Sequence, residues 1–110
     1  MAITIHIFYT GSNGSARAFI DEMIASGTVA KIRGEAGNLR YEYFLPVDDP
    51  QTVLLIDSWE NQTALDRHHA SAMMEIITAL RIKYDLHMRV ERYVSEGDET
   101  VERDAAFIRK

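Results

Sequence analysis

Two aromatic side chains of this sequence have the types and the spacing for chemistry: Trp59 and His68. Imidazole titrates near neutral pH, so His68 is the best candidate for a base that removes a proton from a bound ligand. Trp59 closes a predicted strand just before the predicted helix that carries His68. A large ring at that junction can plug the core or form the wall of a ligand cavity, and the two roles are compatible.

The remaining histidines predict no metal site. His68 and His69 are adjacent on a helix, about 100° apart, which makes them a poor chelating pair. His87 lies among polar neighbours and is expected to be exposed. His6 shares a strand face with Phe8, so it is either a hydrogen-bonded or interface histidine or a group that lines a cavity. The sequence contains no cysteine, which excludes disulfides, thiolate catalysis and zinc–thiolate sites.

The composition is that of one globular domain with an acidic surface. The chain has 110 residues, of which 46% are hydrophobic and 26% charged, and a formal net charge of −5. A negative chain matches nucleic acid or an anionic membrane poorly, so neither partner is expected. No hydrophobic run is long enough to span a membrane, and residues 1–6 lack the basic region of a signal peptide, so the expected location is the cytoplasm. Residues 11–14 lack the lysine and the spacing of a phosphate loop, so no phosphate-binding site is expected there.

Hydrophobic periodicity predicts four strands and three helical stretches. Residues 2–9 alternate with period two, with Ile3, Ile5 and Ile7 on one face. A long helical stretch contains Gly27, where a bend or pause is expected. Strands are predicted over 2–9, 38–46, 52–60 and 85–95, and helices over 16–34, 61–70 and 71–84.

This order, βαββαβ, predicts an α+β fold of the ferredoxin-like type: a four-stranded antiparallel sheet with helices on one face. The unalternating run 53–56 indicates burial on both faces of the sheet. Because the helices cover one face only, a second copy of the chain is the simplest cover for the other, and we expect a homodimer with sheet packed on sheet. Residues 1–95 form the predicted domain, and residues 96–110 form a charged C-terminal tail with a frayed end.

Three motifs resemble the antibiotic biosynthesis monooxygenase (ABM) family of small dimeric α/β-barrel proteins. The segment 57–59, Asp-Ser-Trp, followed by Ala64-Leu65 and His68, resembles the family signature Trp-x4-Ala-Leu-x2-His. Residues 35–41 resemble the family's Glu-x-Gly-x-x-x-Tyr entry into the second strand, and Ser71 stands where these proteins often carry serine. The resemblance covers roughly residues 2–95.

The resemblance implies an activity and a site. Members of the family include cofactor-independent monooxygenases that act on quinols and polyketide phenols. The implied partners are therefore a small aromatic molecule and O2, with no cofactor. Trp59 and His68 match the pair that lines the family's pocket between helices and sheet, and they are the expected catalytic residues. Tyr41 or His6 would orient the substrate's oxygens.

Two further residues, at positions where relatives carry polar site residues, are expected at the substrate, and both differ from the family's pattern. Met73 stands where many relatives carry a second histidine, and Leu55 stands where some monooxygenases carry asparagine. Both differences predict a more apolar pocket.

Two other functions stay open on the same fold. Related barrels degrade haem or isomerise small metabolites, so an isomerase, a lyase or a haem-handling enzyme is one alternative. The few polar candidates in the sequence also fit a non-catalytic ligand-binding or stress-response dimer.

Overall fold

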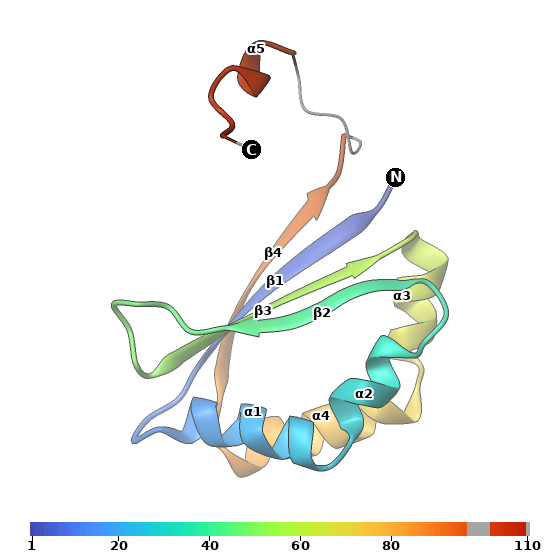
Figure 1. Cartoon of the computed structure of the whole chain (residues 1–110). Helices are drawn as coiled ribbons and strands as arrows, with labels where there is room; N and C mark the ends of the chain where they lie inside the picture. The colour runs from blue at the N-terminus through green and yellow to red at the C-terminus, as the bar shows by residue number, and fades with distance from the viewer. Residues whose placement is uncertain (97–101, 110) are drawn as a thin grey trace.

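The computed structural model describes residues 1–96 and 102–109, and the first of these ranges has the predicted βαββαβ order (Figure 1). The four strands are β1 (Ile3–Thr10), β2 (Asn38–Phe44), β3 (Thr52–Trp59) and β4 (His87–Val94). The helices are α1 (Ser15–Ala25), α2 (Thr28–Arg33), α3 (Gln62–His69), α4 (Ala72–Lys83) and the short α5 (Glu102–Ala105).

The strands form one antiparallel sheet in the order β2-β3-β1-β4, which is the ferredoxin-like topology. The register places Asp57 of β3 opposite Ile5 of β1 on one side and opposite Tyr41 of β2 on the other. Ile5 is paired in turn with Arg92 of β4. Four side chains from four strands therefore lie in one row across the same face of the sheet.

The long helical stretch predicted over 16–34 is two helices, because the pause expected at Gly27 is a complete break. Gly27 has φ of 80°, in the left-handed region that glycine adopts without steric cost. Its backbone N–H donates to the carbonyl of Ile24 at the end of α1, and its own carbonyl accepts from the N–H of Lys31 in α2. The chain thus changes direction and starts α2 over the next part of the sheet.

Helices α1 to α4 all lie on one side of the sheet, as Figure 1 shows. The hydrophobic core fills the space between these two layers, and its largest fully buried side chains come from both of them: Tyr9, Val53, Leu55 and Trp59 from the sheet, and Phe19, Met23, Ile32 and Ile77 from the helices. On the opposite face of the sheet, Phe8, Leu54 and Ile56 are only half-buried within one chain.

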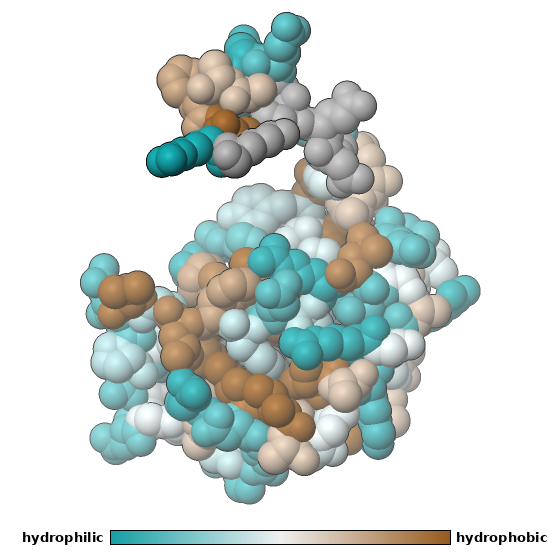
Figure 2. Space-filling model, in the orientation of Figure 1, coloured by the Kyte–Doolittle hydropathy of each residue, from teal (hydrophilic) through white to brown (hydrophobic). Residues whose placement is uncertain are grey.

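Two surface features lie away from that face. Hydrophobic surface between the β2 edge and α1 is visible in Figure 2, where Ile20, Ile24 and Leu45 line a shallow groove. In the predicted tail, residues 102–109 are exposed throughout, including Phe107 and Ile108, while residues 97–101 and 110 lie outside the described residues.

Candidate active site

A cavity of about 380 Å³ lies between the helices and the sheet. Its walls are mostly apolar: Ile5, Ile7 and Leu55 rise from the sheet, and Leu65 and Ile77 descend from α3 and α4. Cavities of a few hundred Å³ with apolar walls and a few polar groups are the usual form of small-molecule sites. The volume suits a small aromatic ring system.

His68 and Trp59, the two expected catalytic residues, are in contact. Their rings are stacked, with centroids 4.7 Å apart and planes inclined by 24°. His68 lines the cavity and is 5% exposed, whereas Trp59 is completely buried behind it and is not among the residues that border the cavity. Trp59 therefore supports the imidazole ring and does not form the cavity wall itself.

Burial and the carboxylate of Glu35 act in opposite directions on the protonation of His68. The Nδ1 atom of His68 lies 2.8 Å from Oε2 of Glu35. Burial lowers the pKa of His68 below its ordinary value of 6.5, against the opposing pull of the Glu35 carboxylate, so the ring is neutral at neutral pH. With the proton on Nδ1 donated to the carboxylate, Nε2 is left with a lone pair that can accept a proton.

Gly37 allows the loop that carries Glu35 to approach α3. Its φ is 83°, and a Cβ atom at this position would collide with the Cβ of Ala64. The Gly37 carbonyl also accepts a hydrogen bond of 2.9 Å from the backbone N–H of Glu60, which holds the loop against the end of β3. Glycine at this point therefore brings Glu35 within reach of His68.

Asp57 is a second titratable group in the cavity, and sequence reasoning assigned it no role. It is 4% exposed, and its Oδ2 atom accepts a hydrogen bond of 2.8 Å from Nε1 of Trp59. Burial raises the pKa of Asp57 from 3.8 to about 6, although the Trp59 hydrogen bond, its own backbone N–H and the charge of Arg81 act in the opposite direction. Asp57 lies two positions from Leu55 and from Trp59 on β3, so strand parity alone places it on the core face.

Arg81 lines the cavity and places a positive charge close enough to Asp57 to lower its pKa, and the sequence analysis did not single it out. Its Nη2 donates to the Tyr9 hydroxyl at 3.1 Å, and its guanidinium lies over the Tyr9 ring at 5.5 Å from the centroid. Arg81 follows Ile77 by one helical turn, so it extends the cavity-facing side of α4.

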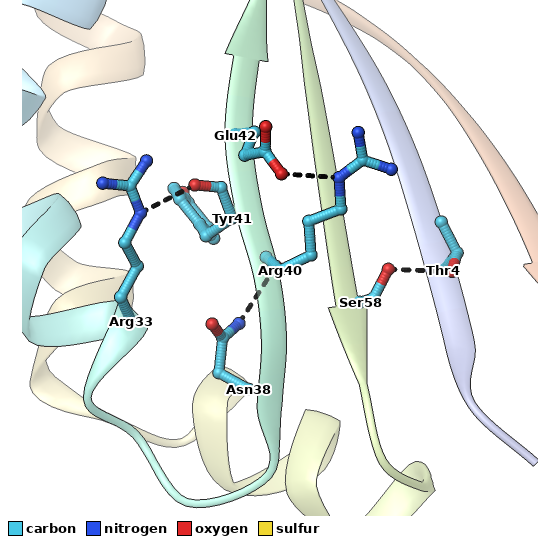
Figure 3. A network of polar contacts seen from close by, with 7 residues as sticks. All are labelled: Thr4, Arg33, Asn38, Arg40, Tyr41, Glu42 and Ser58. Carbon is cyan, nitrogen blue, oxygen red and sulfur yellow. Dashed lines mark hydrogen bonds and ion pairs between the residues drawn. The ribbon is translucent and has the colours of Figure 1, made fainter. Parts of the chain in front are cut away.

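Tyr41 lines the cavity from β2, as expected for a group near the substrate. Burial raises the pKa of Tyr41 well above 10, so its hydroxyl keeps its proton at physiological pH. The Nε of Arg33 in α2 donates to the Tyr41 carbonyl at 2.9 Å, and Figure 3 shows this contact on the helix side of β2.

The other three predicted site residues have different locations. Leu55 lines the cavity wall. Met73 packs against the core, but the methionine that borders the cavity is its neighbour Met74. His6 lies on the opposite face of the sheet, where its ring contacts that of Tyr93 in a tilted arrangement with 4.8 Å between the centroids, so the structure does not bring it to the cavity.

Two absences hold for the described part of the chain. Within residues 1–96 and 102–109, no group of three His, Asp or Glu side chains is placed to hold a metal ion. None of the helices in those ranges is long and apolar enough to cross a membrane.

Comparison with solved structures finds the same fold in several proteins. A protein from Deinococcus radiodurans, provisionally named an antibiotic biosynthesis monooxygenase, is 18% identical, covers 92% of this chain and 98% of its own, and has a TM-score of 0.77. PA3566 from Pseudomonas aeruginosa is 24% identical over 87% of this chain and 95% of its own, with a TM-score of 0.74. SnoaB, a cofactor-independent oxygenase from Streptomyces nogalater, is 14% identical over 88% of this chain and 95% of its own, with a TM-score of 0.72.

Sequence comparison settles the family. Comparison with curated proteins finds no significant match. The family model described as antibiotic biosynthesis monooxygenase matches residues 2–80, which include all of the strands β1 to β3 and the Trp59–His68 pair. The chain therefore belongs to the antibiotic biosynthesis monooxygenase family, as its three motifs predicted.

Proposed function

We propose that this protein is a cofactor-independent monooxygenase that oxidises a small quinol or phenolic ring with O2 inside the cavity. Its family supports a monooxygenase-type function. The observation that carries the finer proposal is the setting of His68. One nitrogen of a neutral imidazole is held by Glu35, and the ring borders a mainly apolar cavity of ring size.

The reaction begins with transfer of the proton from a ring hydroxyl to Nε2 of His68, and Glu35 stabilises the imidazolium that forms. The electron-rich ring anion passes one electron to O2, and the radical pair combines to form a carbon–oxygen bond. When the reacting carbon is a methylene, as in anthrone, the peroxide then loses water and leaves a carbonyl. In balance, CH2 and O2 give C=O and H2O. Ile5, Ile7 and Leu55 keep bulk water away from the anion.

The proposal includes a homodimer and a cytoplasmic location. Phe8, Leu54 and Ile56 leave apolar surface on the sheet face that the helices do not cover, and a second copy packed there would bury it. The absence of cysteine fits a reducing compartment.

Oxygen uptake tests the function. Wild type is assayed with a panel of quinols and anthrone, with no metal or flavin added, beside His68→Ala and the matched control His87→Ala. His87 has an 83% exposed side chain and is not among the residues that line the cavity. We expect wild-type turnover, a loss of about 100-fold or more in His68→Ala, and no change in the control.

Three outcomes contradict the proposal. Equal rates in wild type and His68→Ala dismiss His68 as the base. A requirement for added flavin contradicts the cofactor-free reaction. No turnover, together with a sharp visible band on addition of haemin, favours the haem-handling alternative.

A further inference from the structure

The two carboxylate oxygens of Asp57 have different surroundings. Oδ2 is occupied by the indole N–H of Trp59. Oδ1 is buried and has no hydrogen-bond partner among residues 1–96 and 102–109, although Asp57 borders the cavity. A buried carboxylate oxygen without a partner is costly, so its presence at a cavity points to a donor that a ligand supplies.

Charged and titratable groups line the cavity together with Asp57 and come from every element around it. Arg81 comes from α4, His68 and His69 from α3 and Arg92 from β4, while Tyr9 and Tyr41 come from β1 and β2. The Nη2 atom of Arg81 is engaged with Tyr9, but its Nε is buried and lacks a partner within the described residues. Among the buried side-chain atoms of the described residues that line the cavity, Oδ1 of Asp57 is the acceptor and Nε of Arg81 is the donor that lack a partner.

We propose that Asp57 selects the ligands of this cavity, its ionised Oδ1 accepting a hydrogen bond from a second ring hydroxyl while His68 receives the first. The role of His68 in this inference rests on the proposed function. The preferred substrates are then rings that carry two hydroxyls, since a ring whose second oxygen is methylated leaves Oδ1 unpaired. Because Oδ1 is already buried in the free protein, the diol gains a hydrogen bond to this oxygen that the methylated ring cannot make, and this hydrogen bond strengthens binding by about tenfold.

Trp59 makes the role of Asp57 testable with an isosteric change. In Asp57→Asn, the amide oxygen is needed to accept the indole N–H, so the amide NH2 turns towards the cavity. The variant keeps the contact that positions Trp59 and replaces the cavity's acceptor with a donor. A purely structural role for Asp57 predicts no change in ligand preference.

The preference should also depend on pH. Asp57 is ionised above about pH 6 and accepts the hydroxyl, whereas below that pH the carboxyl carries a proton and no longer favours a donor. Burial raises the pKa of Tyr9 and Tyr41, which stay protonated, and the two guanidinium groups keep their charge. His68 has its pKa lowered, so the Asp57→Asn variant is the control that separates its titration from that of Asp57.

Anaerobic calorimetry tests the inference without turnover. The probes are 1,4-dihydroxynaphthalene and 4-methoxy-1-naphthol, which differ in one donor. The proteins are wild type, Asp57→Asn and the exposed surface variant Asp48→Asn, which removes the same charge. At pH 7.5 we expect wild type and Asp48→Asn to bind 1,4-dihydroxynaphthalene about tenfold more tightly than 4-methoxy-1-naphthol. In Asp57→Asn this difference in affinity should be lost or reversed. At pH 5 the wild-type preference should shrink towards that of Asp57→Asn.

The outcomes separate this inference from the proposed function. Equal wild-type affinity for the two probes, or no binding of either, overturns the role of Asp57 even if oxygen is consumed. An unchanged preference in a folded Asp57→Asn variant overturns it as well. Selective binding that Asp57→Asn abolishes, without oxygen uptake by wild type, supports the role of Asp57 and rejects the monooxygenase reaction.

Discussion

Burial of the Asp57 carboxylate should reduce the stability of the native protein at neutral pH, and its removal should restore that stability. The pKa of Asp57 is raised from 3.8 to about 6 in the folded state. The folded protein therefore binds more protons than the unfolded chain between about pH 4 and pH 6. Its stability falls as the pH rises through this window and is level above about pH 7.

The magnitude follows from the two pKa values. The difference between 3.8 and about 6 corresponds to about 3 kcal/mol of unfolding free energy once the pH is well above 6. Asp57→Asn fixes the side chain in a neutral form of the same shape. We therefore expect the unfolding free energy of this variant to exceed that of wild type by up to about 3 kcal/mol at pH 7.5. Near pH 4 the two unfolding free energies should match.

Urea denaturation at a fixed protein concentration, followed by the fluorescence of Trp59, measures the difference at each pH. The lowered pKa of His68 has the opposite effect on stability. Its contribution to the unfolding free energy is fully present above pH 6.5 and is lost as the pH falls. Both proteins carry His68, so its contribution cancels in the comparison. Asp48→Asn, on the exposed 45–51 loop, should match wild type at every pH. The reasoning is refuted if Asp57→Asn is less stable at pH 7.5, or if its advantage does not depend on pH.

Three further predictions follow from single contacts. Trp59→Phe removes the hydrogen-bond donor to Oδ2 of Asp57, so the pKa of Asp57 should rise further. Urea unfolding followed by circular dichroism at a series of pH values should then show the pH-dependent change in stability at a higher pH than in wild type. Gly37→Ala should cost about 2 kcal/mol or more in urea unfolding, because of its φ of 83° and the clash with α3; Gly34→Ala, at φ of −85°, should cost little or nothing. Ile56→Glu should halve the mass that light scattering gives for wild type, and a wild type that is already monomeric would contradict the proposed dimer.

The fold was predictable because its signals are local. Alternation identified β1, and an apolar run without alternation marked β3. A helical period with a glycine in the middle predicted the pause that separates α1 from α2 at Gly27. Four strands and their helices in this order leave few topologies for a sheet. The resemblance assigned Trp59 and His68 to one site, and they meet there because the end of β3 and helix α3 are joined by a short turn.

The polar groups of the cavity were less accessible to sequence reasoning. Glu35 meets His68 only because the loop before β2 closes on α3, and no local pattern contains that long-range contact. From the sequence, Met73 was expected at the substrate, whereas the side of α4 that faces the cavity carries Met74 and Arg81. A helix has more than one partly apolar side, and its rotation is decided by what it packs against.

Asp57 differs from these cases because the signal for it was present. The run 53–56 is apolar without alternation, which hid the fact that the next position on the core face is occupied by a carboxyl group. Sequences that specify one structure keep such groups out of the core, and the exceptions concentrate at functional sites. Burial of the Asp57 carboxylate costs about 3 kcal/mol, and this cost is large compared with the total unfolding free energy of a small domain. Asparagine or leucine at this position would remove that cost, so the physical case for Asp57 depends on what its free oxygen does in the cavity.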